Sequence, residues 1–239
     1  LAAGSAEEWW LAYVAQGGPL VTYRLDGAGA ATAVAAPIMG PMGPSGNNGN
    51  DGDYFISQVE LQSAGDVTAI VYEVEDRDGT PTGESGPTED VVAATASTGT
   101  WGAAENVNDV SGSTAISALS LAVDATNGQT HIALASGANI YLTDAAGGSE
   151  QTLTSTGAFG GQPVLDAGSV AVAAHNETLR VLYLDANLQS AVIQSSEDGG
   201  TSWSRTSPDD FTASTDLFAL ELEAPDDERI FAGWISDAD

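Results

Sequence analysis

The chain has 239 residues, of which 42% are hydrophobic, and its 34 acidic and 5 basic side chains give a formal net charge of -29. A surface this negative repels phosphate backbones and anionic lipid, which disfavours nucleic acid and anionic membrane surfaces as partners. The absence of cysteine removes disulfides, thiol nucleophiles and thiolate metal sites. No apolar run reaches the length of a transmembrane helix, so we expect no membrane-spanning segment.

The basic residues indicate the kind of medium in which the protein is found. All five are arginine, and there is no lysine. A surface of this kind is typical of proteins in high salt, where cations screen the self-repulsion, and a calcium-rich extracellular medium is the alternative. The opening LAAGS (1–5) is reminiscent of the end of an export signal, although a trimmed terminus explains it equally well. We therefore expect an extracellular or cell-surface protein in a high-salt environment.

The first structured segment is EEWWLAYVAQGGPLVTYRLDG (7–27), which reads as two successive strands of one structural unit. It contains Trp9 and Trp10. Neighbouring residues of a strand point to opposite faces, so one indole packs inside and the other is available for interaction. An exposed tryptophan at this point suits either a glycan platform or an interface with another protein subunit.

A glycine-rich insertion follows at residues 40–53, where glycine occupies every third position, as GPM-GPS-GNN-GND-GDY (40–54). This register is typical of collagen and would bring three chains together, whereas five triplets also suit a polyproline-like or turn-rich loop. Two oxygen-rich loops predict calcium as a candidate cofactor, with solvated turns as the alternative. Their candidate ligands are Asn50, Asp51, Asp53, Asp76, Asp78 and Glu84.

A repeat of about fifty residues organises the rest of the chain. The second strands of successive predicted hairpins begin at Val67, Thr130, Thr178 and Glu228, in steps of 63, 48 and 50 residues. Three or four short strands per repeat predict an all-β fold, a single β-propeller domain over 1–239 with four to five blades, or an arc of a larger propeller. A β-sandwich is the alternative, but it would not predict like units at a near-constant period.

The most specific motif is SEDGGTSW (196–203), which matches the Asp-box pattern through Ser196, Asp198, Gly200, Ser202 and Trp203. It resembles the Asp box of the bacterial-neuraminidase-repeat, sialidase-like propellers, where this motif forms a turn between outer strands of a blade. Asp198 suits such a turn as a hydrogen-bond acceptor and Gly200 as a residue with positive φ. Weaker echoes occur at LDGAGA (25–30), STGTW (97–101) and TDAAGGSE (143–150).

The resemblance implies a sialidase-like fold without the catalytic residues of that family, whose activity requires three clustered arginines. The five arginines here are scattered, and neither His131 nor His175 has a neighbouring nucleophile or zinc motif. We therefore expect no enzymatic activity. The sequence favours an exported structural or interaction module, a subunit of a cell-surface, filament or virion assembly. A degenerate, lectin-like glycan-binding propeller is the alternative, and an active glycoside hydrolase is a third hypothesis.

Overall fold

A computed structural model describes fourteen stretches of the chain. They are residues 2–3, 8–15, 20–37, 54–76, 88–96, 99–107, 116–136, 139–146, 150–153, 170–185, 190–206, 217–223, 229 and 231–236. Every regular element in these stretches is a β-strand, so the prediction of an all-β chain is confirmed. The described residues contain no helix that could span a lipid bilayer.

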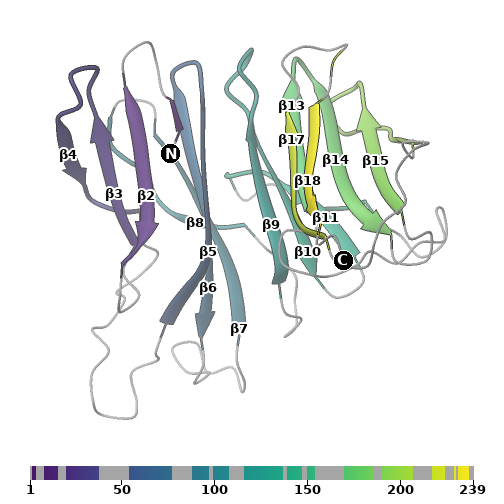
Figure 1. The fold of residues 1–239 in the computed structure, drawn as a ribbon, viewed down its shortest axis with the longest axis horizontal. Coiled ribbons are helices and arrows are strands. Elements are labelled where there is room, and N and C mark those ends of the chain that lie inside the picture. Colours follow the sequence, from purple (N-terminus) through teal and green to yellow (C-terminus); the bar gives the residue numbers. More distant parts are fainter. Residues whose placement is uncertain are drawn as a thin grey trace. The chain divides into compact units, whose positions relative to one another are not determined.

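The strands form five separate antiparallel sheets, which we call A to E in chain order (Figure 1). Sheet A contains β1 (Ala2–Ala3), β2 (Trp9–Val14), β3 (Leu20–Leu25) and β4 (Ala31–Val34). Sheet B contains β5 (Tyr54–Ala64), β6 (Val67–Asp76), β7 (Thr88–Ala96) and β8 (Glu105–Asn106). Sheet C contains β9 (Ile116–Val123), β10 (Thr130–Ser136), β11 (Asn139–Thr143) and β12 (Gln151–Thr152).

Sheet D contains β13 (Val170–His175), β14 (Thr178–Asp185), β15 (Ser190–Ser196) and β16 (Ser204–Thr206), and sheet E contains β17 (Leu217–Glu223) and β18 (Phe231–Ser236). Within each sheet the strands pair in chain order, as a series of hairpins does. The described chain divides into two compact units, one built from sheets A and B and the other from sheets C, D and E.

The core of the first unit lies between sheets A and B. Leu20 of β3 packs there with Ile70 and Tyr72 of β6 and Val92 of β7. The Tyr72 hydroxyl donates a hydrogen bond of 2.7 Å to the backbone oxygen of Pro37, so its polar end is satisfied inside the core. The β-branched and aromatic side chains of β6 suit a strand that is buried on both faces.

The second unit has one apolar layer between sheets C and D and another between D and E. Val172, Val181 and Tyr183 belong to the first layer, and Leu182 and Leu222 belong to the second. Alternate residues of β14 therefore face opposite layers, as the period of a strand requires. Sheet D is covered on both faces because its strands carry long apolar runs.

The hairpins expected from the repeat match the observed pairing of β5 with β6, β9 with β10, β13 with β14, and β17 with β18. Five separate sheets differ from the two packed sheets of a β-sandwich, the alternative in the sequence analysis. Periodicity did not predict β1, β4, β8, β12 or β16, which are two to four residues long. The glycine-rich insertion at 40–53 lies outside the described residues.

Candidate functional site

Sheet A presents an exposed face made of aromatic and aliphatic side chains. Its register places Trp9 opposite Leu25, Leu11 opposite Tyr23 and Tyr13 opposite Val21, so these residues share one face. The pairing of β3 with β4 adds two alanines to it. We call this surface the aromatic face. It consists of Trp9, Leu11, Tyr13, Val21, Tyr23, Leu25, Ala31 and Ala33.

Two large side chains of the aromatic face are open to solvent, since Trp9 is 46% exposed and Tyr13 is 42% exposed. The Tyr13 ring stacks on that of Tyr23, with centroids 6.4 Å apart and an interplanar angle of 9°. Desolvation and the neighbouring Tyr23 hydroxyl raise the pKa of Tyr13, so the ring is uncharged near neutral pH. The two rings form a flat apolar surface on the same face of the sheet as the indole of Trp9.

The other face of sheet A is used for packing. Trp10 is only 3% exposed, and its ring lies 4.8 Å from that of Trp101, at an interplanar angle of 59°. The Trp101 indole N–H donates a hydrogen bond of 3.1 Å to the Thr22 hydroxyl. The expectation that the adjacent tryptophans point to opposite faces is confirmed: Trp10 joins sheets A and B, and Trp9 remains exposed.

The only basic residue in the strands of sheet A is Arg24, which lies opposite Trp10 in the register. It therefore lies on the packed side of the sheet, where its guanidinium pairs with Glu8 at 3.5 Å. The described residues that make up the aromatic face carry no charge. The aromatic face is accordingly a neutral surface on a strongly acidic chain.

The residues of the predicted Asp box lie in the turn between β15 and β16. The Asp198 carboxylate accepts hydrogen bonds from the Ser196 hydroxyl (2.7 Å), the Ser202 N–H (2.8 Å) and the Ser202 hydroxyl (2.6 Å). These bonds hold the pKa of Asp198 at about 2. The Trp203 indole N–H donates to the backbone oxygen of Gly200 at 3.0 Å, and Gly200 has a φ of +92°. The motif is thus a turn stabilised by hydrogen bonds among its own residues.

A simpler version of this turn joins β3 to β4, at the echo LDGAGA. The Asp26 carboxylate accepts hydrogen bonds from the N–H groups of Ala28 (3.0 Å) and Ala30 (2.8 Å). Gly29 has a φ of +82°, as a left-handed turn position requires. The aspartate therefore keeps the same acceptor role in this turn, although the tryptophan and the hydroxyl residues of the full motif are missing.

Three turns meet at one end of the second unit, around Asp124. This side chain, 1% exposed, accepts hydrogen bonds from the Thr126 N–H (2.8 Å) and hydroxyl (2.7 Å). Burial raises its pKa, but these bonds and the backbone N–H groups of Asn176 and Glu177 outweigh burial and lower it. Both of these hairpin residues have positive φ, at 46° and 66°.

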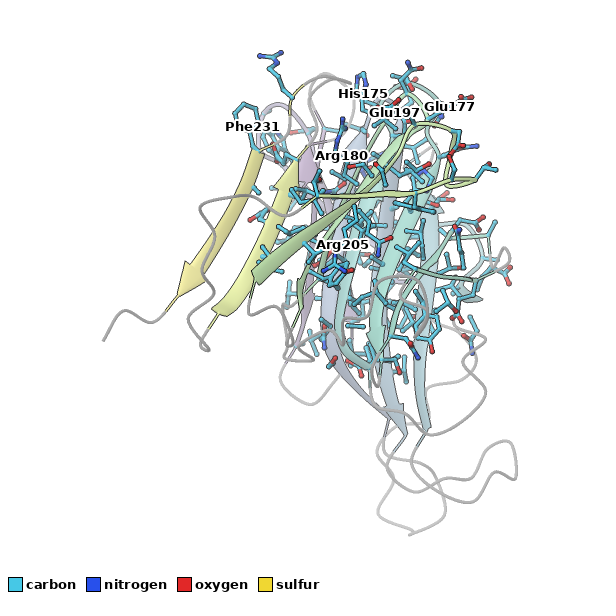
Figure 2. The ribbon with its side chains drawn as sticks, turned by 90° about the vertical axis from the view of Figure 1, so that its right-hand side faces the viewer. His175, Glu177, Arg180, Glu197, Arg205 and Phe231 are labelled. Atoms are coloured by element: carbon cyan, nitrogen blue, oxygen red, sulfur yellow. The ribbon has the colours of Figure 1, made fainter. Side chains whose placement is uncertain are left out.

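The Asp-box turn also contacts the β13–β14 hairpin: the Gly199 N–H donates a hydrogen bond of 2.9 Å to the backbone oxygen of Glu177. Figure 2 shows His175, Glu177 and Glu197 gathered at this end of the unit, with Arg180 further along the sheet. Asp124, directly after β9, thus lies close to the β13–β14 turn, and that turn is hydrogen-bonded to the Asp-box turn through Glu177. The arrangement is a structural connection between two sheets, which sequence reasoning missed because it joins residues far apart in the chain.

His131 of β10 lies near this connection. Its burial lowers the pKa of the imidazole, and the nearby carboxylates of Asp124 and Asp144 oppose that shift only in part. The ring is therefore neutral near pH 7. Among the described residues, no three histidine or carboxylate side chains come close enough to hold a metal ion.

The predicted calcium ligands are not brought together by anything the structure describes. Asp76 ends β6, and its side chain lies outside the described part, as do the whole residues Asn50, Asp51, Asp53, Asp78 and Glu84. Calcium binding by these loops stays a prediction.

No protein-family model matches the sequence, and no curated protein matches it. Solved structures do resemble the fold. An ulvan lyase of polysaccharide lyase family PL25 has a TM-score of 0.55 at 14% identity, over 91% of this chain and 56% of its own. A xylan β-1,4-xylosidase from Bacillus halodurans has 0.49 at 11% identity, over 97% of this chain and 47% of its own.

A sialidase from Trypanosoma rangeli has a TM-score of 0.47 at 12% identity, over 88% of this chain and 38% of its own. The chain thus spans between about a third and just over half of the length of these proteins. Of these three structures, the ulvan lyase has a TM-score above 0.5, and at 14% identity its likeness to this chain concerns the fold alone.

The prediction that the chain has no enzymatic activity is contradicted by the comparison with the ulvan lyase, because a structure of similar fold belongs to an enzyme. The expectation of no activity rested on the missing arginine cluster of the sialidases. The missing cluster excludes the sialidase active site alone, whereas the ulvan lyase of similar fold is an enzyme that acts on another carbohydrate. At identities of 11 to 14%, the likeness concerns the fold, and the activity of this chain is a separate proposal.

Proposed function

We propose that the chain is a sialidase-like propeller, with each sheet forming one blade, and that it recognises a polysaccharide as part of a carbohydrate-active protein. The aromatic face of sheet A carries this proposal. Contiguous exposed apolar surface marks interaction sites on proteins, and flat aromatic rings stack on the C–H faces of sugar rings. Trp9 and Tyr13 offer two such rings on one strand, with Tyr23 stacked beside the second.

The geometry of β2 suits an extended ligand. Trp9 and Tyr13 are four residues apart on the same face, a separation of roughly 13 Å along the strand. Several consecutive sugar rings span that distance, so one polysaccharide chain would contact both aromatic side chains. An isolated monosaccharide would contact only one of them, and we expect it to bind much more weakly.

The medium is also part of the proposal. With a net charge of -29, the chain is suited to high salt, where cations shorten the range of self-repulsion. A polysaccharide outside the cell agrees with the expected extracellular or cell-surface location. Assembly with other protein subunits is compatible with this role, because the aromatic face takes up only one sheet of the chain.

Electrophoresis through gels containing a polysaccharide tests the proposal. The wild-type chain should be retarded by its ligand, and Trp9→Ala and Tyr13→Ala should each weaken binding up to about tenfold, the value of one aromatic stacking contact. Phe231→Ala is the matched control, because Phe231 is 60% exposed on β18 of another sheet. The proposal fails if no polysaccharide retards the chain, or if the control reduces retardation as much as the two variants do.

Catalysis on the bound polysaccharide is measured in the same preparations. Release of new reducing ends or of unsaturated products would identify the chain as an active enzyme and give the type of cleavage. Trp9→Ala should lower this activity mainly through KM, because the indole would bind the polymer without touching the bond that breaks.

A further inference from the structure

We propose that the ligand of the aromatic face is an uncharged polysaccharide, such as a xylan or an arabinan, and not an anionic one. This inference rests on the proposed function and names its substrate class. The fold neighbours do not decide the matter, since their descriptions include both xylan and sialic acid. The charge distribution of this chain does decide it.

Binding an anionic glycan requires positive charge close to the sugar carboxylates or sulfates, and arginine is the residue best shaped for it. The strands of sheet A contain one arginine, Arg24. Its place in the register, opposite Trp10, puts it on the packed face, and Glu8 already pairs with its guanidinium at 3.5 Å. The aromatic face therefore offers an anionic ligand no compensating charge from its own strands.

The surroundings of the aromatic face act in the same direction. Asp26 lies in the exposed turn that joins β3 to β4, where its carboxylate accepts hydrogen bonds from two backbone N–H groups. The chain as a whole has a formal net charge of -29. The field of this charge repels an anionic polymer over about a Debye length, roughly 10 Å at 0.1 M salt. An uncharged polymer avoids this repulsion and loses none of the stacking on Trp9 and Tyr13.

Ala33 provides a way to change the charge of the aromatic face without disturbing its rings. It is exposed, and it lies directly opposite Tyr23 in the pairing of β3 with β4. A long polar side chain at this position extends over the aromatic face. Ala33→Lys and Ala33→Glu therefore form a pair of variants that differ in charge and resemble each other in size.

The test measures retardation by neutral xylan, neutral arabinan and anionic polygalacturonate, each at 0.1 M and 1 M NaCl, two salt levels chosen from the range of screening lengths. We expect the wild type to bind one of the neutral polymers equally well at both salt levels and polygalacturonate at neither. Ala33→Lys should create binding to polygalacturonate at 0.1 M that disappears at 1 M. Ala33→Glu, which adds a side chain of similar length and opposite charge, should leave polygalacturonate unbound at both salt levels.

The outcomes separate the two proposals. If polygalacturonate binds more tightly than the neutral polymers, and Trp9→Ala abolishes that binding, then the charge inference is wrong while the aromatic face remains a glycan site. If none of the polymers binds, then the proposed function fails and this inference fails with it. Trp9→Phe, which keeps an aromatic ring, should retain most of the neutral binding and shows that Trp9→Ala acts by removing the ring rather than by unfolding the sheet.

Discussion

Replacing each of the two adjacent tryptophans by alanine should separate stability from binding: Trp10→Ala mainly lowers stability, and Trp9→Ala mainly weakens binding. Trp10 is 3% exposed and packs on Trp101 at 4.8 Å, so Trp10→Ala leaves a cavity between sheets A and B. Large-to-small changes of this kind cost about 3 to 5 kcal/mol in the free energy of unfolding. Trp9 is 46% exposed, and removing its partly buried indole should cost about 1 kcal/mol.

The difference of roughly 2 to 4 kcal/mol is measured by urea unfolding in molar NaCl, followed by far-UV circular dichroism. Trp9→Ala should bind polysaccharide up to about tenfold more weakly and keep its unfolding midpoint close to that of the wild type. Trp10→Ala should show a large drop in midpoint. Equal losses of stability in the two variants would refute the assignment of the two indoles to opposite faces of sheet A.

Four further variants test the turns and the buried histidine. Hydrogen bonds hold the pKa of Asp198 at about 2, below the 3.8 of the unfolded chain, so its contribution to stability is complete above about pH 4 and is lost as the pH falls towards 2. Acid unfolding of Asp198→Asn should therefore lack the part of the pH dependence seen between pH 4 and 2, and an unchanged acid profile would contradict this. Burial lowers the pKa of His131 below 6.5, so protonation favours the unfolded chain and stability should decrease as the pH falls below about 6.5. Thermal melts should show a smaller decrease for His131→Gln, and the same decrease as in the wild type would indicate other groups. Gly99 has a φ of +79°, and a Cβ at this position would meet Nη1 of Arg24. Gly99→Ala should therefore lower the free energy of unfolding by about 1 to 2 kcal/mol. Gly29 has a φ of +82° and open space around it, so Gly29→Ala measures the cost of the backbone conformation alone.

The longer strands could be predicted because each carries a run of alternating or continuous apolar residues bounded by polar turns. The strands β8 and β12 have two residues each, too few for any period, and their existence depends on pairing with a longer neighbour. The opposite orientation of Trp9 and Trp10 followed from strand geometry alone. The addition of Tyr23 to the same surface did not, because it depends on the register between β2 and β3.

The turns show the same limit. The sequence of SEDGGTSW was sufficient to predict a turn around Asp198, since all its hydrogen-bond donors are within four residues. The role of Asp124 was not predictable from its neighbours, because two of the groups that lower its pKa belong to residues 176 and 177 of another sheet. Local motifs could be predicted, while contacts between sheets required the fold.

The hydrogen bonding of Asp198 has a consequence for how this acidic chain responds to its medium. Both oxygens of that carboxylate are occupied by donors of its own turn, at 2.6 to 2.8 Å. An exposed aspartate elsewhere depends on hydrated cations for the same neutralisation. When salt is diluted and the remaining carboxylates repel one another, the β15–β16 turn should therefore be among the last parts of the second unit to lose its shape. Amide hydrogen exchange of Gly200 and Ser202 during desalting would report that order of loss residue by residue.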